Sequence, residues 1–155
     1  MSELGSEEHT KALKKAFDLL SRREHSCSEL KTKLYSRKFS SSSIEYTLNE
    51  CERLGFINDL NFATRYVAEL QFKSYGIFRL REKLYRKGIS KDIIETVLAK
   101  LDQNEEKQSA RALMEKKLHQ LRRETDEQKK RQKLYRYLIS RGFSSDIVRE
   151  LMNEE

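Results

Sequence analysis

The feature of this sequence that most restricts its fold is an internal repeat of about 50 residues. Sliding the chain over itself by 50 positions places Leu30 and Leu34 on Leu80 and Leu84, and their neighbours match in type. A further slide of 54 positions places Leu84 on Leu138. A unit of this length cannot bury its apolar face alone, so tandem copies are expected to stack in a row.

The apolar spacing within each copy predicts helices. In the first helix, four residues recur at the i, i+3, i+4 and i+7 spacing of a buried face: Leu13, Ala16, Phe17 and Leu20. A run of serines from Ser40 to Ser43 offers several N-caps for a third helix, which leaves its start open by two residues. The 155 residues include no proline and only five glycines, which favours helices over strands and loops.

Helix ends are also marked. Ser26 and Glu29 have the spacing of a capping box before the second helix. Gly88 lies just past the last apolar residue of the equivalent helix in the second copy, where a left-handed cap is expected, and Ser90 can open the next helix. Lys38 stands at the position of Gly88, and a positive φ there would cost about 1 kcal/mol unless this helix ends differently.

The third copy has an insertion. Its first helix matches the second copy at a shift of 47 and its second helix at a shift of 54, so seven residues are added between Gln120 and Lys133. Seven residues are close to two turns and can lengthen helices without rotating their apolar faces. We therefore predict an all-α fold of three tandem three-helix repeats in an elongated, curved array. The predicted segments are a mobile tail over 1–10 and repeats over 11–56, 57–103 and 104–155.

Basic residues are concentrated in windows that follow the repeat. Residues 11–38 hold nine Lys and Arg against three acids, residues 73–91 seven against one, and residues 107–141 twelve against four. The net charge is +7. A charged face is common on soluble helices, but a basic stripe that recurs with the repeat favours a polyanionic partner such as nucleic acid. Any contact with nucleic acid is expected to be with its phosphate backbone, so the affinity should fall as the salt concentration rises.

The candidate contacts lie on the second helix of each copy. They are Arg79, Arg81, Lys83, Arg86, Lys87, Lys31, Lys33, Arg37, Lys129, Lys130, Lys133 and Arg136. Tyr35 and Tyr85 occupy equivalent positions among them, and each could stack on an unpaired base or cover the edge of the core.

No group of residues predicts catalysis, a metal site or a cofactor. The three histidines, His9, His25 and His119, have no ligand at metal-binding spacing. Cys27 and Cys51 align with Ile77 and Leu101 and are expected to be buried apolar residues, while Asp59 is expected to cap a helix. No apolar run approaches the length of a membrane span, and the N-terminus is acidic, so a cytoplasmic location is expected. The chain is also expected to be a monomer.

Several motifs together resemble the RecX family of bacterial recombination regulators. They are Arg23-Glu24-His25-Ser26 with Glu29-Leu30 and Lys33-Leu34, Gly55-Phe56-Ile57-Asn58-Asp59 with Phe62-Ala63 and Tyr66-Val67, and Tyr75-Gly76 with Arg79, Arg81, Leu84 and Lys87-Gly88-Ile89. The resemblance covers residues 12–98 well, and the third repeat is compatible with it. It implies that Arg79, Arg81 and Lys87 form the central basic helix, and that Arg23 and His25 serve structure.

The resemblance implies a non-enzymatic regulator of RecA, the recombinase that coats single-stranded DNA as a helical filament. Family members are thought to lie in the groove of this filament and to inhibit ATP hydrolysis, strand exchange and coprotease activity, which links them to recombination and the SOS response. The implied partners are the RecA filament and single-stranded DNA, with double-stranded DNA as a further candidate. Charge alone leaves open a general helical-repeat DNA-binding protein or a scaffold for an acidic protein.

Overall fold

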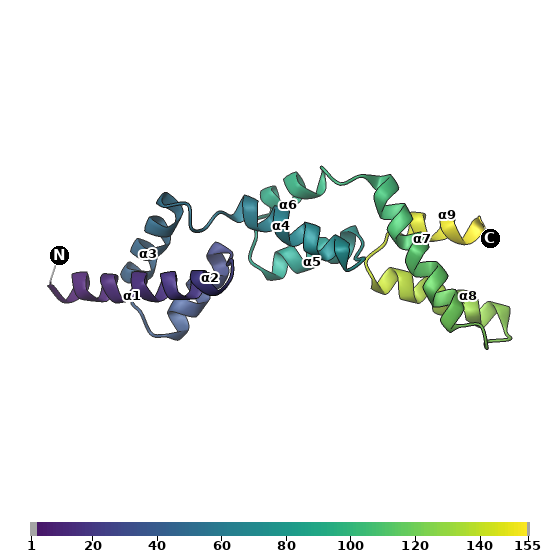
Figure 1. Cartoon of the computed structure of the whole chain (residues 1–155), viewed down its shortest axis with the longest axis horizontal. Helices are drawn as coiled ribbons and strands as arrows, with labels where there is room; N and C mark the ends of the chain where they lie inside the picture. The colour runs from purple at the N-terminus through teal and green to yellow at the C-terminus, as the bar shows by residue number, and fades with distance from the viewer. Residues whose placement is uncertain (1–2, 155) are drawn as a thin grey trace.

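The computed structural model describes residues 3–154, and every regular element within that range is a helix. In chain order the helices are α1 (Glu3–Arg22), α2 (Cys27–Ser36), α3 (Ser41–Arg53), α4 (Asp59–Phe72), α5 (Ile77–Arg86), α6 (Lys91–Leu98), α7 (Gln103–Gln120), α8 (Glu127–Ser140) and α9 (Ser145–Asn153). They form three groups in a row, with the chain ends at opposite ends of the molecule and the middle group displaced to one side (Figure 1). This confirms the predicted all-α array of three-helix units.

Each unit has its own hydrophobic core. The leucines that define the repeat lie at the three centres and are 2% exposed or less: Leu30 and Leu34, Leu80 and Leu84, and Leu134 and Leu138. The extensive packing between helices is confined to helices of the same unit. The structure therefore corrects the expectation that a unit of this length cannot bury its apolar face alone. Within residues 3–154 the units share no core, and they are joined mainly at helix ends and loops, with side-chain pairs such as that of Arg65 on α4 with Glu24.

The buried face of α1 differs from the predicted one. Ala12, Ala16 and Leu19 are buried, whereas Phe17 is 37% exposed. The two alanines lie where α1 packs on α3, and small side chains let helix backbones approach closely. The large ring at position 17 is therefore turned to the side, where it packs edge-on against Phe56 with 5.3 Å between ring centroids.

The N-terminal segment expected as a tail is helical from Glu3 onward. The Glu8 carboxylate accepts hydrogen bonds from the backbone amide and the hydroxyl of Ser40, at 2.7 and 3.1 Å. The ring of His9 stacks on Tyr46 at 4.6 Å. These contacts between α1 and the start of α3 have no counterpart in the other repeats, so the repeat pattern did not predict them.

Most predicted helix ends are confirmed. Ser26 and Glu29 form the capping box of α2, Ser40 is the serine that caps α3, and Ser90 caps α6. Gly88 follows α5 with a φ of 74°. The N-terminus of α4 differs from the prediction. Its N-cap is Asn58, whose side chain accepts a hydrogen bond from the first turn, and not the neighbouring Asp59.

The inserted residues of the third unit lengthen both arms of its first helical hairpin. Helix α7 has 18 residues against 14 in α4, and α8 has 14 against 10 in α5. The insertion of about two turns is thus divided between the two helices. Among residues 3–154, no helix combines the length and apolar character needed to cross a bilayer.

Candidate functional site

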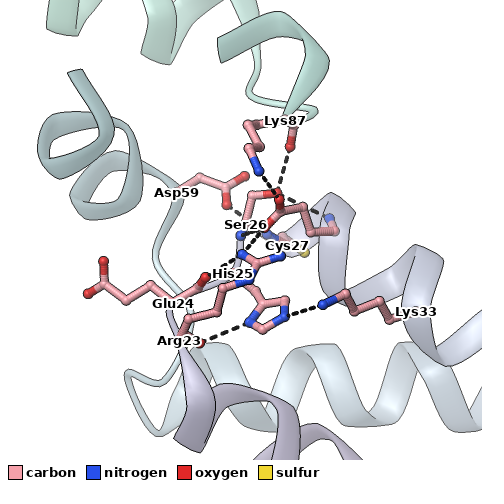
Figure 2. A network of polar contacts seen from close by, with 9 residues as sticks. Arg23, Glu24, His25, Ser26, Cys27, Lys33, Asp59 and Lys87 are labelled. Carbon is pink, nitrogen blue, oxygen red and sulfur yellow. Dashed lines mark hydrogen bonds and ion pairs between the residues drawn. The ribbon is translucent and has the colours of Figure 1, made fainter. Parts of the chain in front are cut away.

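The second helices of the three units meet end to end. At the C-terminus of α5, the carbonyl of Lys87 accepts a 2.6 Å hydrogen bond from the hydroxyl of Ser26, the N-cap of α2 (Figure 2). At the C-terminus of α8, the carbonyls of Arg141 and Gly142 accept from the amides of Gly76 and Phe78, at 2.9 and 3.0 Å. Helices α8, α5 and α2 therefore form one column, which positions the predicted basic residues of all three units.

A carboxylate from the next unit strengthens each of these joints. The Asp59 side chain accepts from the amide of Cys27 at 2.9 Å, and the Glu106 side chain accepts from the amide of Ile77 at 3.0 Å. Negative charge at a helix N-terminus interacts favourably with the helix dipole. The prediction that Asp59 caps its own helix is therefore wrong: its carboxylate bonds to the first amide of α2 in the preceding unit, where Ser26 is the N-cap.

Glu29 is the charged centre of the joint between the first two units. Its carboxylate accepts from Lys87 at 2.6 Å and from Arg23 at 3.1 Å. Burial alone would raise the pKa of Glu29, but the hydrogen bonds from Lys87 and Arg23 outweigh it and hold the pKa below its ordinary value. Lys87, predicted as a partner contact, therefore also holds the units together.

His25 has a structural role in the same region, as the sequence predicted. It is 3% exposed, with Nδ1 2.9 Å from the carbonyl of Arg23 and Nε2 2.9 Å from the ammonium of Lys33. An ammonium can only donate, so Nε2 accepts and the neutral ring has its proton on Nδ1. Burial lowers the pKa of His25, and the cations Arg23 and Lys33 lower it further, although the bond to the Arg23 carbonyl opposes this.

The cations predicted on α5 are mostly paired within the chain. The pairs are Arg79 and Arg86 with Glu82, Arg81 with Glu95, and Lys87 with Glu29. Lys83 instead lies 5.0 Å from the centre of the Tyr75 ring. The pairs with Glu82 and Glu95 are substantially exposed, and pairs of this kind contribute at most about 1 kcal/mol. A phosphate could therefore exchange for either carboxylate at little cost.

The remaining predicted cations are divided between the two ends of the column. Lys31, Lys33 and Arg37 lie on or beside α2, where Arg37 donates to the carbonyl of Lys33. Four more lie on α8: Lys129, Lys130, Lys133 and Arg136. Of these, Lys133 pairs with Glu124 at 2.7 Å. The structure thus distributes the predicted residues along the column instead of gathering them in one pocket.

A groove of about 410 Å³ between α8 and α9 contains basic residues that the sequence analysis missed. Its lining includes Arg131 and Arg149 beside the predicted Arg136. The repeat alignment could have revealed Arg149. At the shift of 54 positions this arginine aligns with an acid of the second unit, Glu95. The residues that are alike in all copies predict the fold, whereas the replacement of an acid by an arginine in the third copy indicates the groove.

The cysteines have no sign of reactivity. Burial raises the pKa of the Cys27 thiol and raises that of Cys51 to about 11. Raised pKa values favour the protonated thiol at neutral pH. Cys51 is buried as expected, whereas Cys27 is only half-buried. Within residues 3–154, no three side chains of His, Cys, Asp or Glu gather as a metal-binding group would require.

Comparison with known proteins identifies the repeats. Residues 12–51 match the first three-helix domain of RecX, residues 58–98 the second, and residues 104–152 the third. The chain belongs to the RecX family. The regulatory protein RecX of Chlorobium phaeobacteroides is 40% identical over 146 residues, which cover 91% of this chain and 93% of that protein. The regulatory protein RecX of Legionella pneumophila is 36% identical over 94% of this chain and 95% of its own length.

Solved RecX structures have the same arrangement of units. The crystal structure of RecX from Lactobacillus salivarius superposes with a TM-score of 0.86 at 25% identity, covering 96% of this chain and 97% of that one. A second crystal structure of a regulatory protein RecX gives a TM-score of 0.87 at 22% identity, covering 97% of this chain and 74% of that one. The three-unit array is therefore the RecX fold.

Proposed function

We propose that this chain is a non-enzymatic, cytoplasmic regulator of the RecA recombinase that binds the RecA filament on single-stranded DNA. Bound as a monomer in the helical groove of the filament, it would inhibit ATP hydrolysis, strand exchange and coprotease activity, and so modulate recombination and the SOS response. The main support is the match of all three units to RecX domains, together with relatives that are named regulatory proteins.

The shape of the array supports a long partner. Three units joined end to end present their second helices in one column, which suits a filament better than a compact ligand (Figure 1). Each unit keeps its own core, and the joints consist mainly of hydrogen bonds at helix ends, so adjacent units can adjust their angle to a helical groove without exposing apolar surface.

The test is ATP hydrolysis by RecA on single-stranded DNA with this protein added at substoichiometric amounts. We expect the steady-state rate to fall, because one elongated molecule in the groove contacts several RecA subunits. Heat-denatured protein is the control for non-specific effects. An unchanged rate at any molar excess would exclude the proposal.

A general DNA-binding protein is the second candidate, favoured by the arginines of the α8–α9 groove, which have no ion-pair partner among the described residues. It predicts the same affinity for bare DNA and for DNA coated with RecA. Pull-down on preformed filaments, with bare DNA and free RecA as controls, separates the two: selective retention on filaments supports regulation of RecA.

A further inference from the structure

The second and third units differ in charge at two equivalent positions. In the second unit, Glu82 and Glu95 form ion pairs with three cations of α5, which are Arg79, Arg81 and Arg86. At the shift of 54 positions that aligns the second helices, Glu82 corresponds to Arg136 and Glu95 to Arg149. Arg81, the partner of Glu95, corresponds to Tyr135. Where the second unit has an ion pair between α5 and α6, the third unit therefore has an aromatic ring with arginines on both α8 and α9.

These replacements line one open groove. Arg131, Arg136 and Arg149 surround it, Tyr135 is half-buried in its wall, and the buried Met152 lies at its base. Three amide side chains complete the lining: Gln128, Gln132 and Asn153. No acidic side chain from the described part of the chain lines this groove.

Two acids at the C-terminal end of α9, Glu150 and the C-cap Glu154, are directed away from the groove. Glu150 pairs with Lys107, and Glu154 pairs with Lys107 and Arg111, so both carboxylates face α7. Within the groove, Arg131 donates a long hydrogen bond of 3.5 Å to the carbonyl of Met152, which carries no full negative charge. The three guanidinium groups therefore lack an ion-pair partner among residues 3–154 and produce a concentrated positive potential.

We propose that the α8–α9 groove binds single-stranded DNA, with arginines on the phosphates and a base stacked on Tyr135. Guanidinium groups match phosphate oxygens in a forked, bidentate geometry, and an aromatic ring accepts the face of any base. The amides offer both donors and acceptors to the edges of a base. The DNA identity rests on the proposed function, in which the partner filament contains single-stranded DNA.

The lining favours an unpaired strand over the other anionic ligands. A base within a duplex is stacked and paired, so its face cannot reach a ring that is recessed between two helices. An acidic peptide would need an apolar pocket for its anchoring side chains, and Met152 alone provides a shallow one. Three guanidinium groups beside one ring are the combination typical of single-strand binding.

The experiment measures fluorescence anisotropy of labelled oligothymidylate with the full-length chain and no RecA, over a range of salt concentrations. The groove variant combines Arg131→Gln, Arg136→Gln and Arg149→Gln. The matched control removes three exposed, ion-paired arginines elsewhere, with the same change in net charge: Arg22→Gln, Arg53→Gln and Arg65→Gln. Circular dichroism checks that both remain helical.

We expect the groove variant to lose roughly 100-fold in affinity at about 0.1 M salt, with the slope of log K against log salt reduced by about 2, because each phosphate contact on a single strand contributes about 0.7. The control should keep most of its affinity and slope. Tyr135→Leu should weaken binding by roughly tenfold, whereas Tyr135→Phe, which keeps the ring, should not.

Three results would overturn the assignment. One is equal loss in the groove and control variants, which would mean that only net charge matters. Another is tighter binding of blunt duplex than of oligothymidylate by the unmodified chain. The third is displacement of the oligonucleotide by polyglutamate from the unmodified chain but not from the groove variant, which would make the groove a peptide site. Because RecA is absent, none of these results depends on inhibition of its ATPase.

Discussion

Replacing Gly88 by alanine should break the joint between the first two units. Gly88 has a φ of 74°, and a Cβ there would overlap the Cβ and Oγ of Ser28, far inside the roughly 3.5 Å at which carbon atoms reach contact. The positive φ costs alanine about 1 kcal/mol. Moving Ser28 away would also lose the hydrogen bond between Ser26 and the Lys87 carbonyl, worth about 1 kcal/mol. The expected loss in the free energy of unfolding is about 2–3 kcal/mol.

The equivalent position of the first unit is a matched control. Lys38 has a φ of 65°, close to that of Gly88, but it is exposed, and within residues 3–154 no other unit docks on α2 at this end. Lys38→Gly should therefore stabilise the chain by about 1 kcal/mol, since it relieves only the backbone strain.

Urea unfolding followed by circular dichroism measures both effects. A loss at Gly88 no larger than the gain at Lys38 would refute the steric explanation, because strain alone would then account for both. The double variant Gly88→Ala with Ser28→Gly provides a second check. Since the overlapping atoms belong to the Ser28 side chain, and the Cα of Ser28 lies 3.7 Å from the new Cβ, removing that side chain should recover part of the loss.

Two further variants probe the same joint. His25 has a lowered pKa, so the unfolded chain binds more protons than the folded one below pH 6.5, and stability should fall with decreasing pH by up to about 1.4 kcal/mol per unit until the folded pKa is reached. His25→Tyr, which copies Tyr75 of the second unit, should flatten this slope in unfolding experiments between pH 5 and 6.5, and an unchanged slope would contradict the assignment. Glu29→Gln should cost about 1–2 kcal/mol at pH 7, because Lys87 and Arg23 lose their anion. Because the pKa of Glu29 is lowered in the folded chain, this difference should shrink as the pH falls through that lowered pKa, and a loss that stays the same throughout an acid titration would count against a charge effect.

The three units are predictable from the sequence because their cores repeat. Leu34, Leu84 and Leu138 fill equivalent places, so sliding the chain over itself is enough to reveal three helical units. Caps such as Ser26 are also predictable, since the capping box is a local pattern. The side of α1 on which Phe17 lies cannot be predicted from the sequence, because it depends on the close packing of α1 against α3.

The candidate surfaces were less predictable for a similar reason. Spacing along α5 showed that cations share a stripe, but only the fold showed that Glu95 reaches Arg81 across two helices. Asp59 likewise acts on the amide of Cys27, 32 residues away in the chain. Contacts of this kind depend on how helices meet, and the helical period of one segment contains no information about its neighbour.

The column of second helices also shows what a joint of this kind requires of the accepting helix. The C-terminus of α5 accepts the N-terminus of α2, and the C-terminus of α8 accepts that of α5, each beside a glycine, Gly88 or Gly142, whose missing side chain makes the room. Helix α2 ends at Ser36, and Lys38 follows it at the place of these glycines, so its side chain stands where another helix N-terminus would have to dock. A joint of this kind therefore requires a glycine just past the C-terminus of the accepting helix, and Lys38 makes the C-terminus of α2 unsuitable for one.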